Sequence, residues 1–233
     1  MKTKLLIPLF ALLLPRAAEA EILTGFCGAE GENISYTLDT ESGELTLAGS
    51  GRMADYNEGS SNNRTPWGNG NLQRVVVGEG ITHLGNDAFS YDLGSRLVSV
   101  TLPSTLVSIG EGSFADSEQL AGISLPAGLK RIGHGAFSGC TALAEVNLPD
   151  GLDYIGNSAF EGCSAITSVR IPEGIDSLQN YSFRNCGGLA EIVLPSGLTY
   201  IGYSALASCS ALKHIDLPAT LKAIEAGAFE GSG

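Results

Sequence analysis

The chain has 233 residues, of which 25 are Asp or Glu and 13 are Lys or Arg, so its net charge is −12. An acidic chain without a basic cluster argues against binding to nucleic acid or to anionic membrane surfaces. Its 31 glycines and its low content of charged residues (16%) suit a turn-rich fold that forms one architectural unit.

Residues 1–20 have the three parts of a secretory signal peptide. Lys2 and Lys4 give the positive start, an apolar run follows at 5–14, and small residues stand at the cleavage site, 18–20. The apolar run is too short to span a bilayer permanently, and no other run approaches that length. We therefore expect a secreted or cell-surface protein whose mature chain is not inserted in a membrane.

Residues 21–71 precede the repeats and are predicted to form a β-hairpin cap. Apolar residues alternate with polar ones at Ile34, Tyr36 and Leu38, and again at Leu45 and Leu47. The link at 39–43 favours a tight turn, and its glycine stands one place too early for a calcium loop. We expect the hairpin to cover the open end of the first coil, with Trp67 packed against that coil. Residues 58–64 are expected to form a flexible polar loop.

A motif of 23 residues fills the rest of the chain, residues 72–233. Its copies begin at Leu97, Leu120, Leu143, Ile166, Leu189 and Leu212, and a looser copy of 25 residues begins at Leu72. A strict period of this length is typical of a solenoid, in which each unit buries its apolar face only by stacking on its neighbours. The sequence therefore predicts seven stacked coils.

The copy at 143–165 illustrates what one coil contains. Val146 and Leu148 alternate with polar residues as in a half-buried strand, and Pro149 ends that strand. Residues 152–155 form a second extended run, Gly156 lets the backbone turn sharply, and the run to Gly162 suits one turn of α or 3₁₀ helix. The predicted fold class is therefore α/β, mostly short strands with one helical turn in each coil.

Phenylalanine recurs at one place of the repeat. Equivalent residues of stacked coils lie about 4.8 Å apart, so like residues form ladders. We expect a buried aromatic column, broken only at Leu206, from Phe89, Phe114, Phe137, Phe160, Phe183 and Phe229. A buried aromatic side chain removes about 150–250 Å² from water, so this column supplies much of the core.

The pattern L-x-x-V-x-L-P-x-x-L-x-x-I-G-x-x-A-F-x-x-C resembles the BspA-like leucine-rich repeat family of bacterial and protist surface proteins. The resemblance extends from Leu72 to Gly233, and the lead-in with Cys27-Gly28 and Pro66-Trp67 is also similar. It implies a right-handed, curved leucine-rich-repeat solenoid with a surface or secreted binding role. It implies no catalytic residue.

Cysteine recurs near the end of four copies, at Cys140, Cys163, Cys186 and Cys209. Four rungs span about 14 Å, whereas one zinc ion holds its sulfur ligands at about 2.3 Å, so a shared metal is excluded. Disulfides between adjacent rungs are compatible with the spacing, and so is a row of small buried thiols. Ser117, Ser232 and Asp92 occupy the same place, which favours space filling. Cys27 is either buried in the cap or free to pair with another molecule.

No catalytic or cofactor-binding group is predicted. His83, His134 and His214 fall at three different places of the repeat, so we expect them on different faces, without a metal site or triad. Residues 49–54 fit a loose G-x-G-x-x-A, but no amphipathic helix follows, so a nucleotide loop is not expected. The repeat spreads like residues along a line and does not converge them. We therefore expect a protein that is not an enzyme and that needs no cofactor or metal.

Two strips of outward residues are candidates for partner binding. The first strip varies between copies and comprises Glu145, Asn147, Arg170, Glu191, His214 and Asp216. The second carries Tyr154, Tyr200 and Tyr203, with Tyr181 nearby, and tyrosine is enriched at interfaces. An unconstrained solvent face explains the variation equally well, and partial packing along the coil edge also explains the tyrosines.

These observations favour a secreted or cell-surface, non-enzymatic solenoid that binds a protein or glycan ligand at a cell surface or in the matrix. Adhesion is what the family resemblance implies. The alternative is an assembly element that stacks end to end, because no cap resembling residues 21–71 follows the last coil, 212–229. In that case its terminal coil docks on another chain; if it remains unpaired, it frays.

Overall fold

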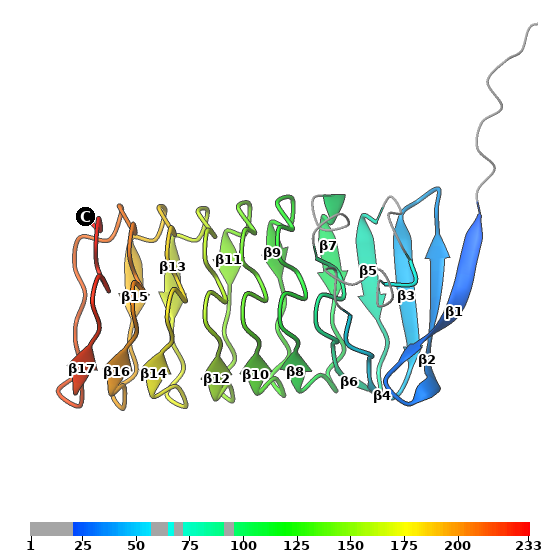
Figure 1. The fold of residues 1–233 in the computed structure, drawn as a ribbon, viewed down its shortest axis with the longest axis horizontal. Helices are drawn as coiled ribbons and strands as arrows, with labels where there is room; N and C mark the ends of the chain where they lie inside the picture. Colours follow the sequence, from blue (N-terminus) through cyan, green and yellow to red (C-terminus); the bar gives the residue numbers. More distant parts are fainter. Residues whose placement is uncertain (1–20, 57–64, 68–71, 91–95) are drawn as a thin grey trace, which may run out of the picture.

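The computed structural model describes residues 21–56, 65–67, 72–90 and 96–233. The expected signal peptide at 1–20 and polar loop at 58–64 lie outside these residues. The described chain forms a β-solenoid of about six turns, which runs lengthwise from the blue to the red end in Figure 1. The expected seven coils are not confirmed, because residues 91–95 of the first copy lie outside the described part.

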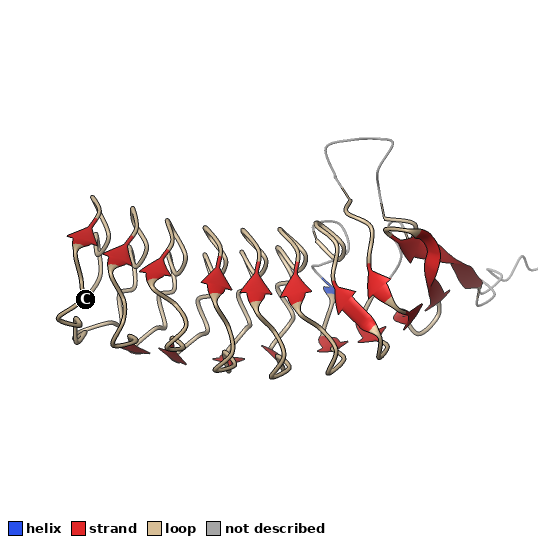
Figure 2. Ribbon diagram, turned by 90° about the horizontal axis from the view of Figure 1, so that it is seen from below, coloured by secondary structure: helices blue, strands red, loops and turns tan. Residues whose placement is uncertain are grey.

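The coils place short strands on two sides of the solenoid, except that the last coil, 212–233, has a strand on the second side only (Figure 2). The first-strand side consists of β5 (Arg74–Val77), β7 (Ser99–Thr101), β9 (Gly122–Ile123), β11 (Glu145–Val146), β13 (Ser168–Arg170) and β15 (Glu191–Val193). The second-strand side consists of β4 (Gly51–Arg52), β6 (Ile81–His83), β8 (Ser108–Ile109), β10 (Arg131–Ile132), β12 (Tyr154–Ile155), β14 (Ser177–Leu178), β16 (Tyr200–Ile201) and β17 (Ala223–Ile224). Paired neighbours run parallel and are offset by one repeat, as in Ile132 with Ile155.

Three antiparallel strands close the N-terminal end: β1 (Ile22–Gly28), β2 (Gly31–Asp39) and β3 (Glu44–Gly49). β2 and β3 form the hairpin that the alternation indicates, whereas β1 was not expected. β3 then pairs in parallel with β5, so the cap extends the first-strand side. The sheet edge of the first coil is thereby covered.

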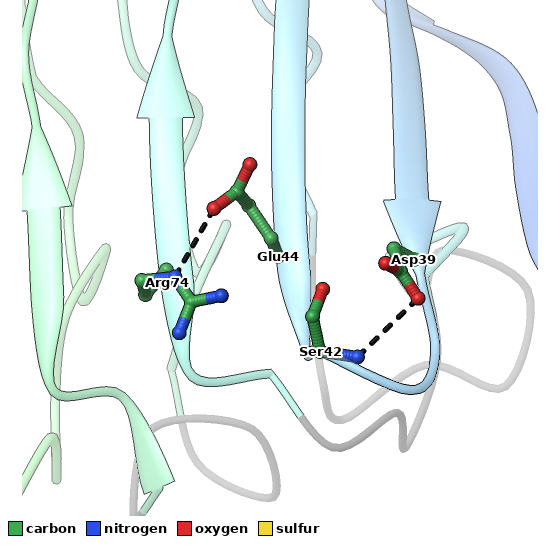
Figure 3. Close-up of polar contacts among 4 residues, drawn as sticks. All are labelled: Asp39, Ser42, Glu44 and Arg74. Carbon is green, nitrogen blue, oxygen red and sulfur yellow. Dashed lines mark hydrogen bonds and ion pairs between the residues drawn. The ribbon is translucent and has the colours of Figure 1, made fainter. Parts of the chain in front are cut away.

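The hairpin turn is held by polar contacts (Figure 3). Asp39 Oδ1 accepts hydrogen bonds from the backbone N–H groups of Glu41 (2.9 Å) and Ser42 (3.3 Å). Hydrogen bonds from Ser42, and then from Glu41, lower the pKa of the Asp39 carboxyl group. Between the cap and the first coil, Arg74 Nε donates to Glu44 Oε2 at 3.1 Å. The acidic residues at 39–43 therefore stabilise a turn.

The aromatic column is confirmed from Phe89 to Phe183. Successive ring centroids lie 5.3–5.4 Å apart, and the rings are stacked with interplanar angles of 6–19°. Trp67 extends the column into the cap, since its ring stacks on Phe89 at 5.7 Å and its Nε1 donates to the Ala88 carbonyl. Phe229, beyond the break at Leu206, is only partly buried.

The corner between Gly156 and Cys163 is not helical, so the expected helical turn, and with it the α/β class, is corrected: the described residues contain almost no helix. Alternate amides, those of Ser158, Phe160 and Gly162, donate to the following coil at 2.8–2.9 Å. The amides between them close short turns within their own coil. A helix needs consecutive amides for its own i−4 carbonyls, and these amides are otherwise engaged.

The glycine after the second strand was expected to allow a sharp backbone turn, but in the structure it allows a close approach between coils. Gly162 adopts a left-handed conformation (φ 74°), whereas Gly156 does not. A Cβ atom on Gly156 would lie 2.6 Å from the His134 amide nitrogen of the preceding coil. Gly110, Gly133 and Gly202 approach their preceding coils equally closely. The missing side chain therefore lets successive backbones come within hydrogen-bonding distance.

The strand ladders open once on both sides of the solenoid. β11 does not pair with β13, and β12 does not pair with β14, among the described strands. The first-strand side is also unpaired between β7 and β9, but there β8 and β10 remain paired. Figure 1 shows the wider spacing between β11/β12 and β13/β14. We call this place the open junction; it lies between the coils 143–165 and 166–188.

Hydrogen bonds of the corner persist across the open junction. Ser158, Phe160 and Gly162 still donate to the next coil there, and the Phe160 and Phe183 rings remain stacked at 5.3 Å. The backbone bonds that flank the strands at other junctions are those made by the amides of Ala144, Asp153 and Gly156. Their equivalents, at Thr167, Asp176 and Gln179, do not reach the preceding coil in the described structure. The coils therefore separate at the strands and stay joined at the corner.

The open junction coincides with the loss of a glycine at position 179. Gln179 occupies the place that Gly110, Gly133, Gly156 and Gly202 hold in other coils. A Cβ atom at this place points at the backbone of the preceding coil, as the close approaches of those glycines indicate, and here the coil stands away from its predecessor. Glu225 also replaces the glycine but keeps its backbone bond to Ile201, so a Cβ atom at this place does not break the ladder in every coil.

Candidate partner-binding surface

The first-strand side carries the first predicted strip. The strand alternation turns Val146, Val169 and Ile192 inward, where they are buried, and leaves Glu145, Arg170 and Glu191 exposed. His214 and Asp216 lie in the last coil, and His214 Nε2 contacts Asp216 Oδ1 at 3.0 Å. Both of these side chains are more than four-fifths exposed, so this contact is a weak surface pair.

The open junction brings three residues of this strip together. A hollow of about 220 Å³ lies over the separated strands β11 and β13, and its lining includes Asn147, Arg170 and Glu191. Val193, which is 47% exposed, adds an apolar wall. Arg170 Nη1 bridges the junction to Asp150 Oδ1 at 2.8 Å. The hollow thus offers a cation, a carboxylate, an amide and an apolar surface side by side.

Tyr154 and Tyr200 lie elsewhere, on the second-strand side, where β12 and β16 place them. Tyr154 is half-buried because the Arg131 guanidinium covers its ring, 4.1 Å from the ring centroid. Its hydroxyl lies 2.8 Å from His134 Nε2. The nine predicted residues therefore do not form one continuous surface.

Two histidines share a hollow, which corrects the expectation that they lie on different faces. His83 and His134 both line a depression of about 340 Å³ on the second-strand side, together with Arg52, Arg131 and Tyr154. His134 directly follows the glycine after the second strand, and its side chain still lies on the second-strand side. Its place in the repeat alone did not indicate this. Burial, and then the Arg52 charge, lower the pKa of His83. The described residues contain no group of three His, Cys, Asp or Glu side chains able to hold a metal.

Tyr203 lies on a third surface, at the corner. Its ring meets Tyr181 edge-on, with centroids 5.4 Å apart and an interplanar angle of 81°. The Arg184 guanidinium lies 5.3 Å from the centroid of Tyr181. Arg184 was missed by the sequence reasoning, because its place in the repeat carries unrelated residues in other copies. The aromatic residues beside it were the available signal.

The four ladder cysteines are free and buried, which supports the space-filling interpretation over disulfides between adjacent rungs. Each thiol donates to the carbonyl of a phenylalanine in the preceding coil, for example Cys163 Sγ to Phe137 O at 3.1 Å. Ser232 makes the equivalent bond to Leu206 O. Cys27 is also free and buried in the cap, which leaves no exposed thiol among the described residues. Burial raises the pKa of Cys140 to about 12.

Among the residues that the structure describes, none of the helical segments has the length and hydrophobicity of a membrane span. A model of the BspA type leucine-rich repeat region matches six copies, over residues 68–131 and 108–233. A leucine-rich repeat protein of Treponema pallidum, TpLRR, is 26% identical (TM-score 0.61) over 78% of this chain and 88% of its own. A leucine-rich repeat protein of Bacteroides ovatus is 29% identical (TM-score 0.66) over 85% of this chain.

This chain spans about half (49%) of the length of the Bacteroides ovatus protein. No match was found among curated proteins. The comparisons therefore support the repeat architecture independently of the side-chain geometry.

Proposed function

Because the chain belongs to the BspA-type leucine-rich repeat family, we propose that it is an exported, non-enzymatic scaffold that binds a protein partner through its first-strand side. The observation that carries this proposal is the hollow at the open junction, where Asn147, Arg170 and Glu191 converge. Solenoids of stacked repeats commonly bind partners along an extended face. The buried apolar core behind this face keeps it rigid, so less conformational entropy is lost when a partner binds.

The chemistry of the surface indicates what the partner presents. Asp150 pairs with Arg170, and Glu191 shares the lining of the hollow with it, so carboxylates lie around this cation. A partner with basic side chains at the rim, and one carboxylate or carbonyl directed at Arg170, matches this arrangement. Val193 provides the apolar contact that charged rims alone do not supply.

Export and cell-surface adhesion are part of the same proposal. The three-part signal at 1–20 supports export, and the family supports display at a cell surface. Fractionation of the source cells tests this step directly. The processed chain is expected in the medium or on the cell surface, and cytoplasmic retention of a chain that keeps residues 1–20 contradicts it.

Site-specific photo-crosslinking tests the binding face. A photoreactive residue replaces Asn147 on the first-strand side, and a matched control replaces Asp153, which is exposed in the same coil next to the second strand. We expect a discrete crosslinked protein from cell-surface or host extracts with Asn147 only. The charge reversal Glu191→Lys should abolish that product. Equal products at both positions, or none at either, contradict the proposal.

End-to-end assembly is a second candidate, which rests on the last coil. Leu217 and Ile224 are each 46% exposed there, and β17 has one unpaired edge among the described strands. Apolar residues beside an unpaired strand edge favour pairing with another coil. Light scattering should then give a mass that rises with concentration and falls with Ile224→Lys. A monomer at all concentrations excludes this candidate.

A further inference from the structure

We propose that the corner formed by Tyr181, Arg184 and Tyr203 is a binding site for a neutral glycan, separate from the protein-binding face. The corner joins the coils 166–188 and 189–211, and it does not overlap the lining of the hollow at the open junction. A backbone outlier, an aromatic pair with a cation, and a concave polar lining carry this inference.

The first observation is the backbone of Tyr181, which is left-handed with φ 59°. The equivalent places in other coils hold Gly112, Gly135, Gly227, Ser158, Ser204 and Asp87, all with positive φ. Small residues and Asp tolerate this conformation, whereas a bulky side chain there is a genuine outlier. The fold is satisfied by glycine at this place, so tyrosine is not required for the turn. Strain of this kind concentrates at binding sites.

The second observation is what the strained backbone presents. It aims the Tyr181 ring at Tyr203, whose side chain is 45% exposed, and the two rings meet at 81°. Arg184 is held beside them by Glu161, with 3.5 Å between Nη1 and Oε1. A guanidinium has five N–H donors, so one ion pair leaves donors for a ligand. The corner therefore combines apolar ring surface with fixed polar groups.

The third observation is the shape and the lining. A hollow of about 550 Å³ is bordered by Tyr181, Arg184, Tyr203, Ser208 and Glu230. Its size falls in the range of small-ligand sites, about 300–1,000 Å³. A standard protein interface buries about 800 Å² on each partner, whereas this hollow is confined to one corner of the coils. Ring surface packs on the C–H face of a sugar, while Arg, Ser and Glu side chains hydrogen-bond to its hydroxyl groups.

The charge of the corner selects the kind of glycan. Glu161 already neutralises Arg184, and Glu230 adds a further carboxylate to the lining. The whole chain is strongly acidic, with a net charge of −12. Sialylated or sulfated glycans are therefore repelled, and neutral hexoses or N-acetylhexosamines are favoured.

The test uses the full exported chain and four neutral trisaccharides as probes: cellotriose, chitotriose, mannotriose and galactotriose. Saturation-transfer NMR detects binding, and calorimetry measures affinity. We expect at least one trisaccharide to bind, and Tyr203→Ala to weaken it about tenfold or more, as truncation of an aromatic hot spot does.

A glycine variant separates a binding role from a structural one. Tyr181→Gly should abolish trisaccharide binding without lowering Tm, because glycine relieves the left-handed strain. Ser158→Gly is the matched control, since Ser158 is the equivalent left-handed residue (φ 54°) one coil earlier. This control should leave binding unchanged.

Three outcomes overturn the inference. They are no binding of any trisaccharide, binding that survives Tyr181→Gly, or a Tm that falls with Tyr181→Gly. If a photoreactive residue in place of Tyr203 crosslinks a protein while no saccharide binds, the corner is a protein contact and the glycan inference fails. Crosslinking through Asn147 is independent of these results, so this inference and the proposed function fail separately.

Discussion

At the scale of the residue, two buried serines at one place of the repeat differ in their hydrogen bonds. Ser113 Oγ lies 2.9 Å from the carbonyl oxygens of both Gly85 and Gly110, so its hydroxyl group can donate a hydrogen bond to either. Ser182 Oγ is fully buried and has no partner among the described residues. Alanine holds this place at Ala136, Ala159 and Ala205. The hydroxyl of Ser182 therefore has a desolvation cost without a compensating bond.

We predict that Ser182→Ala raises the free energy of unfolding by about 1 kcal/mol, because it removes an unsatisfied buried hydroxyl. Ser113→Ala, the matched control, should lower it by about 1 kcal/mol, since it removes a satisfied one. Urea unfolding of both variants measures the difference. If Ser182→Ala destabilises as much as Ser113→Ala, the assigned hydrogen bonds are wrong.

The buried thiols predict the response to alkaline pH. Burial raises the pKa of Cys140 to about 12 and that of Cys209 to about 11, whereas an exposed thiol titrates at about 8.5. Above a pH of about 8.5, the unfolded chain loses thiol protons that the folded chain keeps. The free energy of unfolding therefore falls as the pH rises from about 9 to about 11. Each such thiol contributes at most about 1.4 kcal/mol per pH unit.

The measurement is Tm between pH 8 and 11. In the variant with Cys140→Ser and Cys209→Ser, the decline of Tm should be shallower than in the wild type. Serine does not titrate in this range and retains the bond to the preceding coil, as Ser232 does. An identical decline in both proteins contradicts the linkage.

The residues that could be predicted are those fixed by the period. Phe114, Phe137 and Phe160 are stacked as expected because a ladder position repeats its environment in every coil. Tyr181 was noted for its ring, but its left-handed backbone was not anticipated. The conformation of that place is visible in the sequence only through Gly112 and Gly135, whose meaning depends on the turn geometry.

At the scale of the element, the glycine after the second strand predicts how tightly coils approach. Gly156→Ala would place a Cβ atom 2.6 Å from the backbone of His134, so it should destabilise by about 1–3 kcal/mol through forced separation of the coils. Gly197→Ala is the matched control, because nothing lies within 4 Å of its added Cβ atom. Chemical denaturation of both variants checks this. Equal stability of the two refutes the close-approach explanation.

The corner illustrates why local sequence misled the prediction of elements. A run of small residues around Phe160 suits a helical turn when it is considered alone. In the stack, the Phe160 amide instead donates to Ser182 of the next coil at 2.9 Å. Tertiary hydrogen bonds thus replaced the local ones. The strand β1 was missed for a related reason: Ile22 and Phe26 are more than half exposed, so its alternation does not resemble that of a half-buried strand.

At the scale of the whole molecule, the 23-residue period predicted that the coils stack, but it did not predict the open junction between two of them. Gln179 resembles ordinary variation between copies until the close contacts of Gly156 and Gly202 are known. The first strip was therefore predicted as variable residues on evenly spaced coils. The hollow that gathers Asn147, Arg170 and Glu191 follows from the open junction and could not be anticipated.

We predict that Gln179→Gly closes the open junction. Without the Cβ atom, β14 can approach β12, and β13 can approach β11, so that the missing backbone bonds form. The variant should be more stable in urea, and crosslinking through a photoreactive residue at position 147 should decrease as the hollow closes. Unchanged stability together with unchanged crosslinking refutes the role of Gln179.

Native-state hydrogen exchange, resolved by residue, tests the central claim that the coils stay joined at the corner and separate once at the strands. The amides of Ser158, Phe160 and Gly162 should be protected. Those of Thr167, Asp176 and Gln179 should exchange much faster than their equivalents Ala144, Asp153 and Gly156, which donate to the preceding coil at 2.9–3.0 Å. Equal protection of these two sets would contradict the open junction and, with it, the proposed binding hollow.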